Sequence, residues 1–139
     1  PSAGGIYPLR HYVAIGNVEG IEPGIYAYSP HELRLVRSGD FRRDIVRSAL
    51  GQAFIGEAAA VIFLSGVPSE TARKYGERGA EKYLPLDIGM SAENIFLQAE
   101  ALNLSTITVG AFSDSGLSQI FRLSQREVPY LLMPVGKPR

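Results

Sequence analysis

The chain has 139 residues, 45% of them hydrophobic and 20% charged, which suffices for the core of one globular domain over residues 1–139. Its 14 basic and 14 acidic residues cancel, so no bulk charge attracts nucleic acid or an anionic membrane. The absence of cysteine excludes disulfides, thiolate catalysis and sulfur-rich metal sites. Because no apolar run reaches membrane-spanning length and no signal peptide is visible, the sequence predicts a cytoplasmic protein.

The predicted elements mix strands and helices. In chain order they are strands at 11–15, 25–28 and 33–36, a helix at 41–50, a strand at 58–64, helices at 70–82 and 86–102, a strand at 105–109, a helix at 115–123 and a strand at 130–135. Asp40 and Ser69 are the expected N-caps of two helices, and Pro85 is expected to separate helix 70–82 from helix 86–102. The mixture of hairpins and longer connections favours an α+β fold.

Several familiar catalytic patterns are missing. The sequence has no nucleophile elbow and no P-loop, and Gly4-Gly5 is not a dinucleotide fingerprint because no strand precedes it. The two histidines, His11 and His31, are isolated in the sequence and are expected to be structural or solvated. With no cysteine and two separated histidines, no metal site is predicted.

The first eight residues, Pro1-Ser2-Ala3-Gly4-Gly5-Ile6-Tyr7-Pro8, are the most informative segment. The prolines stiffen both ends, and the small residues between them let a flat ligand lie against main-chain N–H groups. On these residues alone, an ordinary N-terminal loop remains the alternative. The first residue is not methionine, which indicates that the N-terminus was trimmed, processed or not included.

Five segments, in order, resemble the nitroreductase family of flavin enzymes, and in particular its SagB-type branch, which includes azoline oxidases of thiazole and oxazole peptide biosynthesis. They are residues 1–8, Arg73-Lys74-Tyr75-Gly76-Glu77-Arg78-Gly79, Asp87-Ile88-Gly89-Met90-Ser91-Ala92-Glu93-Asn94, Thr108-Val109-Gly110-Ala111-Phe112 and Pro134-Val135-Gly136-Lys137-Pro138. Each segment alone is a weak signal. Together they span nearly the whole chain in the family's order.

The resemblance implies a nitroreductase-like fold with a mainly antiparallel central sheet flanked by helices. It also implies an intertwined homodimer that binds one FMN at each of two junctions. The implied cofactor-binding residues are Ser2, Ala3 and Gly4 in a loop contacting flavin held mainly by the other subunit, Asp87 and Met90 on the long helix, Thr108, Val109, Gly110 and Ala111 beneath the ring, and Lys137 and Arg139 at the phosphate.

These implied roles agree with the chemistry of the residues. A flavin that accepts hydride gains electron density at N5, N1 and O4, which directed N–H donors stabilise. Gly110 leaves room for the ring to approach the backbone, and a cation near the chain end can neutralise phosphate. In the alternative, Gly110 simply ends a strand and Lys137 is a solvated residue.

The resemblance also singles out Lys74 and Tyr75, because a Lys-Tyr pair is implicated in catalysis in the azoline-oxidising members. Oxidation of an azoline removes a carbon-bound proton while hydride goes to the flavin. Lys74, desolvated beside the ring, could serve as the base, and Tyr75 could orient substrate or relay the proton. The alternative is a surface Lys74 paired with Glu77 or Glu70.

The sequence also departs from the family. The Arg-rich segment that usually precedes the Pro-Ser loop and holds the FMN phosphate is missing, so either the chain is a fragment or truncation, or Lys137, Arg139 or another base has taken over. Met90 stands where relatives often carry histidine, and Glu93 where they often carry glutamine. Both changes alter the polarity expected near the pocket, so the substrate is not carried over.

The function implied by the resemblance is an FMN-dependent oxidoreductase that transfers hydride through flavin N5 by a ping-pong mechanism. The reaction would be either NAD(P)H-dependent reduction of nitro or quinone acceptors or SagB-type dehydrogenation of a heterocycle, on a small-molecule or peptide substrate. Two alternatives stay open. The protein could bind or sequester flavin without catalysis, or Pro1 could act as a secondary-amine base, as in tautomerases.

Overall fold

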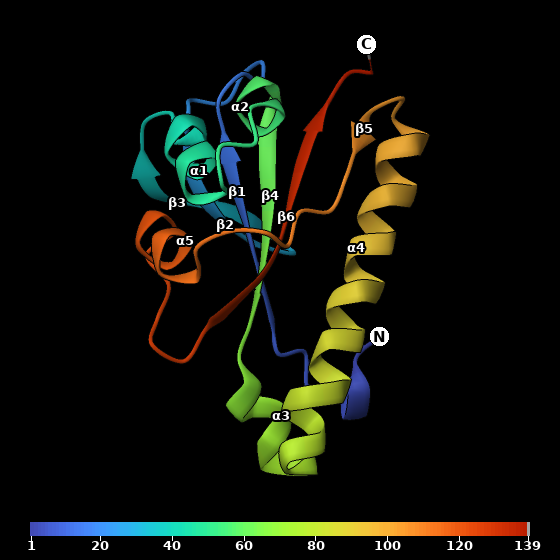
Figure 1. Cartoon of the computed structure of the whole chain (residues 1–139). Coiled ribbons are helices and arrows are strands. Elements are labelled where there is room, and N and C mark those ends of the chain that lie inside the picture. The colour runs from blue at the N-terminus through green and yellow to red at the C-terminus, as the bar shows by residue number, and fades with distance from the viewer. Residues whose placement is uncertain (139) are drawn as a thin grey trace.

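The computed structural model describes residues 1–138, and these form a sheet with helices on both faces (Figure 1). The strands are β1 (Leu9–Ile15), β2 (Gly24–Ser29), β3 (Glu32–Ser38), β4 (Ala60–Gly66), β5 (Ser105–Thr106) and β6 (Val128–Gly136). The strand order within the described residues is β3-β2-β1-β4-β6-β5, and every pairing is antiparallel. The predicted α+β class and antiparallel central sheet are confirmed.

Within residues 1–138, four helices cover the two faces of the sheet, and α3 (Pro68–Tyr75) lies beyond the end of β4 (Figure 1). The helical elements, in chain order, are η1 (a 3₁₀ turn, Ala3–Gly5), α1 (Arg42–Ser48), α2 (Phe54–Glu57), α3, η2 (a π-helix, Gly79–Tyr83), α4 (Leu84–Ala101) and α5 (Asp114–Ile120). The short helices α1, α2 and α5 cover one face, and the long α4 runs along the other (Figure 1).

Strand β4 is buried on both faces, which explains its continuous apolar sequence. Val61 and Phe63 belong to the core beneath α1, α2 and α5, whereas Leu64 belongs to the core beneath α4. The Phe63 ring stacks on Phe121 with the ring centroids 4.3 Å apart. The predicted interior strand is therefore confirmed, shifted to residues 60–66.

The predicted helix over residues 70–82 is wrong. Helix α3 begins at Pro68, with Val67 at its N-cap and Ser69 inside the first turn, and it ends at Tyr75 because Gly76 adopts a left-handed φ of 62°. The chain then forms η2, where Gly79 packs so closely on α3 that a Cβ there would lie 2.6 Å from the Thr71 carbonyl oxygen.

Pro85 does not separate two helices, because it lies in the first turn of α4, where its missing N–H costs no hydrogen bond. The predicted strand over 105–109 is also too long: β5 ends at Thr106, and Val109 rejoins the sheet through a single bridge to Leu132. Helix α5 is capped by Ser113, whose Oγ accepts from the Gly116 N–H at 3.2 Å. Nothing in the sequence analysis anticipated α2.

The remaining boundaries agree more closely with the sequence. The predicted N-cap Asp40 is wrong by one residue, because α1 runs from Arg42 to Ser48 with Phe41 at its N-cap; Asp40 still accepts a hydrogen bond from the Arg42 N–H at 3.1 Å. Helix α4 covers the predicted long helix and buries Ile88, Ala92 and Ala99. Within residues 1–138, no helix combines the length and apolar character needed to cross a membrane.

Candidate functional site

The main candidate site is a pocket of about 800 Å³ where the N-terminal loop meets β1 and α4. Its walls come from the loop (Pro1, Ser2, Tyr7), from β1 (Leu9, Arg10, His11, Tyr12), from the β2–β3 hairpin (Ala27, Tyr28, Ser29, Pro30, Glu32, Arg34), from the segment around α3 (Val67, Glu70), from α4 (Asp87, Met90, Ser91, Asn94) and from the chain before β6 (Ser124, Arg126, Glu127). Three predicted cofactor-binding residues, Ser2, Asp87 and Met90, line it.

Asp87 anchors the N-terminal loop to α4. Asp87 is 4% exposed, and its carboxylate accepts from the Ser2 hydroxyl and, at 3.3 Å to each oxygen, from the Ala3 N–H. The Ser2 Oγ in turn accepts from the Tyr7 N–H at 3.1 Å. A buried carboxylate needs such donors, so the pairing of Ser2 with Asp87 fixes the loop on the helix.

Lys74 and Tyr75 of α3 contact the same N-terminal loop at Gly4. The Lys74 Nζ donates to the Gly4 carbonyl oxygen at 3.3 Å, and the Tyr75 ring packs edge-on against Tyr83. Gly4 has a left-handed φ of 62°, and a Cβ there would lie 2.8 Å from the Lys74 Nζ and overlap the Tyr75 hydroxyl. The loop is thus held between α3 and α4, and neither Lys74 nor Tyr75 is among the residues that line the pocket.

The segment Thr108–Ala111 lies beside β6, away from the N-terminal loop. Val109 and Leu132 exchange backbone hydrogen bonds of 2.8 and 2.9 Å, which fixes the segment on the sheet. Gly110 is exposed, and a Cβ there would meet only Leu131, at 4.0 Å. The backbone at Gly110 is therefore open to a flat ligand, while the Ala111 carbonyl oxygen accepts from Gln52 at 3.2 Å.

Lys137 follows the end of β6 that lies far from the N-terminal loop, Ser2 and Asp87. The start of β6, Val128, pairs with Gly66 near α3, whereas its end, Gly136, pairs with Ser105 of β5 (Figure 1). Nine strand residues span about 27 Å at about 3.4 Å per residue. One chain therefore does not bring Lys137 to Ser2, and Arg139 lies outside the described residues.

A second pocket, of about 970 Å³, surrounds Lys137. The end of β6, β5 and the following Ile107 form one wall, and Phe54 and residues 57–59 with Asn17 and Glu19 form the other. The Thr106 Oγ1 at this pocket is buried and has no hydrogen-bond partner within the described residues. Lys137 is exposed at this pocket, so its ammonium can meet an anionic ligand here.

The sequence analysis missed the polar residues that β1 contributes to the first pocket. The His11 Nε2 lies 2.9 Å from the Ser91 Oγ, and burial lowers the pKa of His11. Tyr12 donates to Glu127 at 2.7 Å, and burial, together with that carboxylate, raises the pKa of Tyr12. His11 was expected to be structural or solvated, yet it lines the pocket. No short-range sequence signal could reveal this, because its partner lies 80 residues away.

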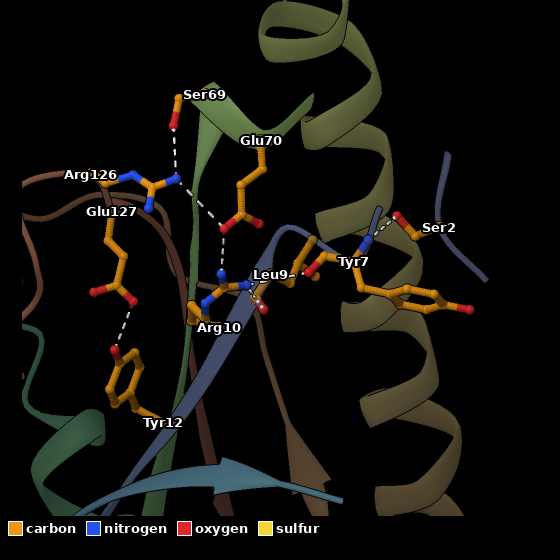
Figure 2. Close-up of polar contacts among 9 residues, drawn as sticks. All are labelled: Ser2, Tyr7, Leu9, Arg10, Tyr12, Ser69, Glu70, Arg126 and Glu127. Carbon is orange, nitrogen blue, oxygen red and sulfur yellow. Dashed lines mark hydrogen bonds and ion pairs between the residues drawn. The ribbon is translucent and has the colours of Figure 1, made fainter. Parts of the chain in front are cut away.

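Arg10 forms the third missed contact. Its Nη2 lies 2.6 Å from the Glu70 Oε1, and Arg126 approaches the same carboxylate oxygen at 3.8 Å (Figure 2). The two ion pairs join β1, α3 and the turn before β6 at the rim of the pocket.

The comparisons with known proteins agree with one another. The family model described as "Nitroreductase family" matches residues 1–137. A protein of Methanocaldococcus jannaschii that carries a nitroreductase assignment is 40% identical over 139 residues, which cover 99% of this chain and 69% of that protein. A solved structure with the same assignment, from Anabaena variabilis, superimposes with a TM-score of 0.91 at 31% identity and covers 100% of this chain.

The Escherichia coli microcin synthetase complex McbBCD, solved with truncated pro-MccB17 bound, contains a chain that superimposes over 100% of this one with a TM-score of 0.85. At 21% identity, that likeness shows the fold. This chain spans 29% of the Anabaena chain and 55% of the E. coli chain. The resemblance drawn from the five sequence segments is confirmed at the level of the family: the chain belongs to the nitroreductase family of oxidoreductases.

Proposed function

We propose that the chain is an FMN-dependent oxidoreductase in which two copies complete each flavin site. The observation that carries this proposal is that the expected cofactor residues fall into two groups at opposite ends of the sheet. Ser2, Asp87 and Met90 meet at one end of the sheet, whereas Lys137 lies at the other end of β6. A ligand that uses both groups needs one from each of two chains.

The residues present fit FMN. Lys137, which is exposed in the second pocket, would neutralise the phosphate. Gly110 would let the ring approach the backbone, and the N–H groups of Gly110 and Ala111 would supply donors, whereas the Val109 N–H is already used by Leu132. When bound, FMN supplies hydride acceptance and donation at N5.

The exposed face of α4 supports association with a second copy. Leu86, Met90 and Leu97 are 55%, 50% and 61% exposed, and their spacing places them along one side of the helix. Apolar side chains gathered in this way favour a protein partner. We infer that α4 packs against the second copy and that the N-terminal loop, held by Asp87 beside this face, reaches the flavin of that copy.

The proposal includes two alternative reactions. One is NAD(P)H-dependent reduction of nitro or quinone acceptors, and the other is SagB-type dehydrogenation of a heterocycle in a small-molecule or peptide substrate. In the second reaction, Lys74 would accept the carbon-bound proton at Nζ and Tyr75 would orient the substrate. The contact of Lys74 with Gly4 places its Nζ on the loop that the proposal brings to the flavin, and Lys74 would act there as the neutral amine.

The first experiment measures flavin binding and oligomeric state together. Purified protein with added FMN should bind close to one FMN per chain, and light scattering should give a dimer. Lys137→Gln should weaken FMN by about tenfold or more and riboflavin little, because a charge-assisted hydrogen bond contributes about 1.5–3 kcal/mol. Lys82→Gln, an exposed lysine on η2, is the matched control. A flavin-loaded monomer would contradict the shared site.

The second experiment separates the enzyme from a non-catalytic flavin-binding protein and tests Lys74. Bound flavin that neither NAD(P)H nor candidate substrates reduce would favour the non-catalytic alternative. Lys74→Ala should leave the thermal midpoint and FMN affinity nearly unchanged and slow a proton-abstracting reaction about a hundredfold. Hydride transfer from NAD(P)H to a quinone should change little. Loss of flavin in this variant would instead make Lys74 a cofactor-positioning residue.

A further inference from the structure

The first pocket passes around the edge of β1 and therefore has two arms. Pairing with β2 begins at His11 with Tyr28, so the edge of Leu9 and Arg10 extends beyond the β2–β3 hairpin. Side chains alternate along a strand, so His11 points to α4 and contacts Ser91, while Arg10 and Tyr12 point to the opposite face. Figure 2 shows Arg10 and Tyr12 on one side of β1, with Ser2 and Tyr7 beside α4 on the other.

The arm on the Arg10 side, which we call the arginine arm, contains two carboxylates that already have close donors. Glu70 accepts from Arg10 at 2.6 Å, and Arg10 is itself fixed by donating to the carbonyl oxygens of Tyr7 and Leu9 at 3.3 and 3.0 Å. Glu127 accepts from the Tyr12 hydroxyl at 2.7 Å and from the Ser124 N–H at 2.9 Å. The acidic groups of the arginine arm are therefore largely satisfied by the protein.

Arg126 is not satisfied in the same way. Its Nη2 lies 3.8 Å from the Glu70 Oε1, beyond hydrogen-bond distance, and 3.4 Å from the Ser69 Oγ, at the long limit of a hydrogen bond (Figure 2). Its side chain is 59% exposed and lines the pocket. A guanidinium has five N–H donors in a planar fork, so Arg126 keeps a donor edge for a ligand.

We propose that Arg126 binds an oxyanion group, carboxylate or phosphate, of a substrate long enough to reach from the α4 side of the pocket into the arginine arm. This inference rests on the proposed function, because it names the substrate class of that site. Three arginines, three glutamates and Asp87 line the pocket, so net charge does not select an anion. Selection comes from hydrogen-bonding capacity: Glu70 holds Arg126 loosely in place and leaves its fork open to an oxyanion, which it can bind through two parallel hydrogen bonds.

The test measures equilibrium binding to the FMN-loaded protein by calorimetry, so that it does not depend on turnover. One pair of probes is NADP⁺ and NAD⁺, which differ by a phosphate. The other pair is a blocked peptide ending in glutamate and the same peptide ending in glutamine, which differ by a carboxylate. We expect the anionic member of one pair to bind about tenfold more tightly, and Arg126→Gln to abolish that preference. The pair that shows the preference identifies the phosphate or the carboxylate as the natural group.

Arg47→Gln is the matched control, because Arg47 is also exposed and ion-paired but lies on α1 outside the pocket. This variant should keep the preference. If wild-type protein binds both members of each pair equally, or if Arg126→Gln keeps the preference, the inference is wrong. Failure of the protein to bind FMN at all would instead contradict the proposed function, so the two failures are distinguishable.

Discussion

Replacing Asp87 by alanine tests whether this carboxylate holds the N-terminal loop on α4. The change removes the acceptor of the Ser2 hydroxyl and of the Ala3 N–H. A hydrogen bond to a charged group contributes about 1.5–3 kcal/mol, and the Ala3 N–H, 3.3 Å from each of two oxygens, belongs at the weak end of that range. Loop opening should therefore become easier by about 3 kcal/mol, or about a hundredfold.

Hydrogen exchange measures that opening directly. The amides of Ala3 and Tyr7 should exchange about a hundredfold faster in Asp87→Ala, while those of Phe63 and Leu64 in β4 should keep their protection, because the sheet core does not depend on the loop. Asp44→Ala, which removes an exposed carboxylate of α1, is the control and should leave both regions unchanged. Unchanged exchange at Ala3 and Tyr7 in Asp87→Ala would refute the anchoring role.

Three further predictions concern groups around the pocket and α4. The pKa of His11 is lowered below 6.5 by burial, so the unfolded chain binds the proton more readily than the folded chain. The free energy of unfolding should therefore fall as the pH drops below about 6.5. Denaturant titration of His11→Gln should show less of this loss. The pKa of Tyr12 is raised above 10 by burial and by Glu127, so the stability that neutral Tyr12 contributes to the fold should be complete below pH 10 and decline above it. Tyr12→Phe should show a shallower decline of stability at alkaline pH in the same assay. Leu97→Glu should shift a dimer to monomer in light scattering with little loss of monomer stability, since Leu97 is 61% exposed; an unchanged dimer would place the interface elsewhere.

Local sequence patterns predicted most of the sheet and the long helix because their signals are short-ranged. The continuous apolar run of β4 and the three- and four-residue spacing in α4 each report burial that the structure shows. The errors arise where a single backbone conformation overrides composition. The charged segment 70–82 has a helical composition, but the left-handed Gly76 and the close approach of Gly79 to Thr71 divide it into α3 and η2.

The candidate site was predictable only where a family motif marked it. The resemblance singled out Ser2, Asp87 and Lys74, and the structure brings them together around one loop. It gave no sign of Arg126 or His11, whose contacts join residues 56 and 80 positions away in the sequence. Such pairings depend on strand order, and a single sequence does not determine strand order.

Once the strand order is known, the division of the proposed flavin site follows from topology. Strands β1 and β6 both pair antiparallel with β4, so they run in the same direction. The loop that precedes β1 and the lysine that follows β6 must then lie at opposite ends of the sheet, whatever side chains they carry. The two motifs that the family resemblance assigns to one FMN, residues 1–8 and 134–138, therefore cannot meet at the ends of parallel strands within one chain. For this reason we place the second copy within the proposed active site and expect loss of the dimer and loss of flavin to accompany each other.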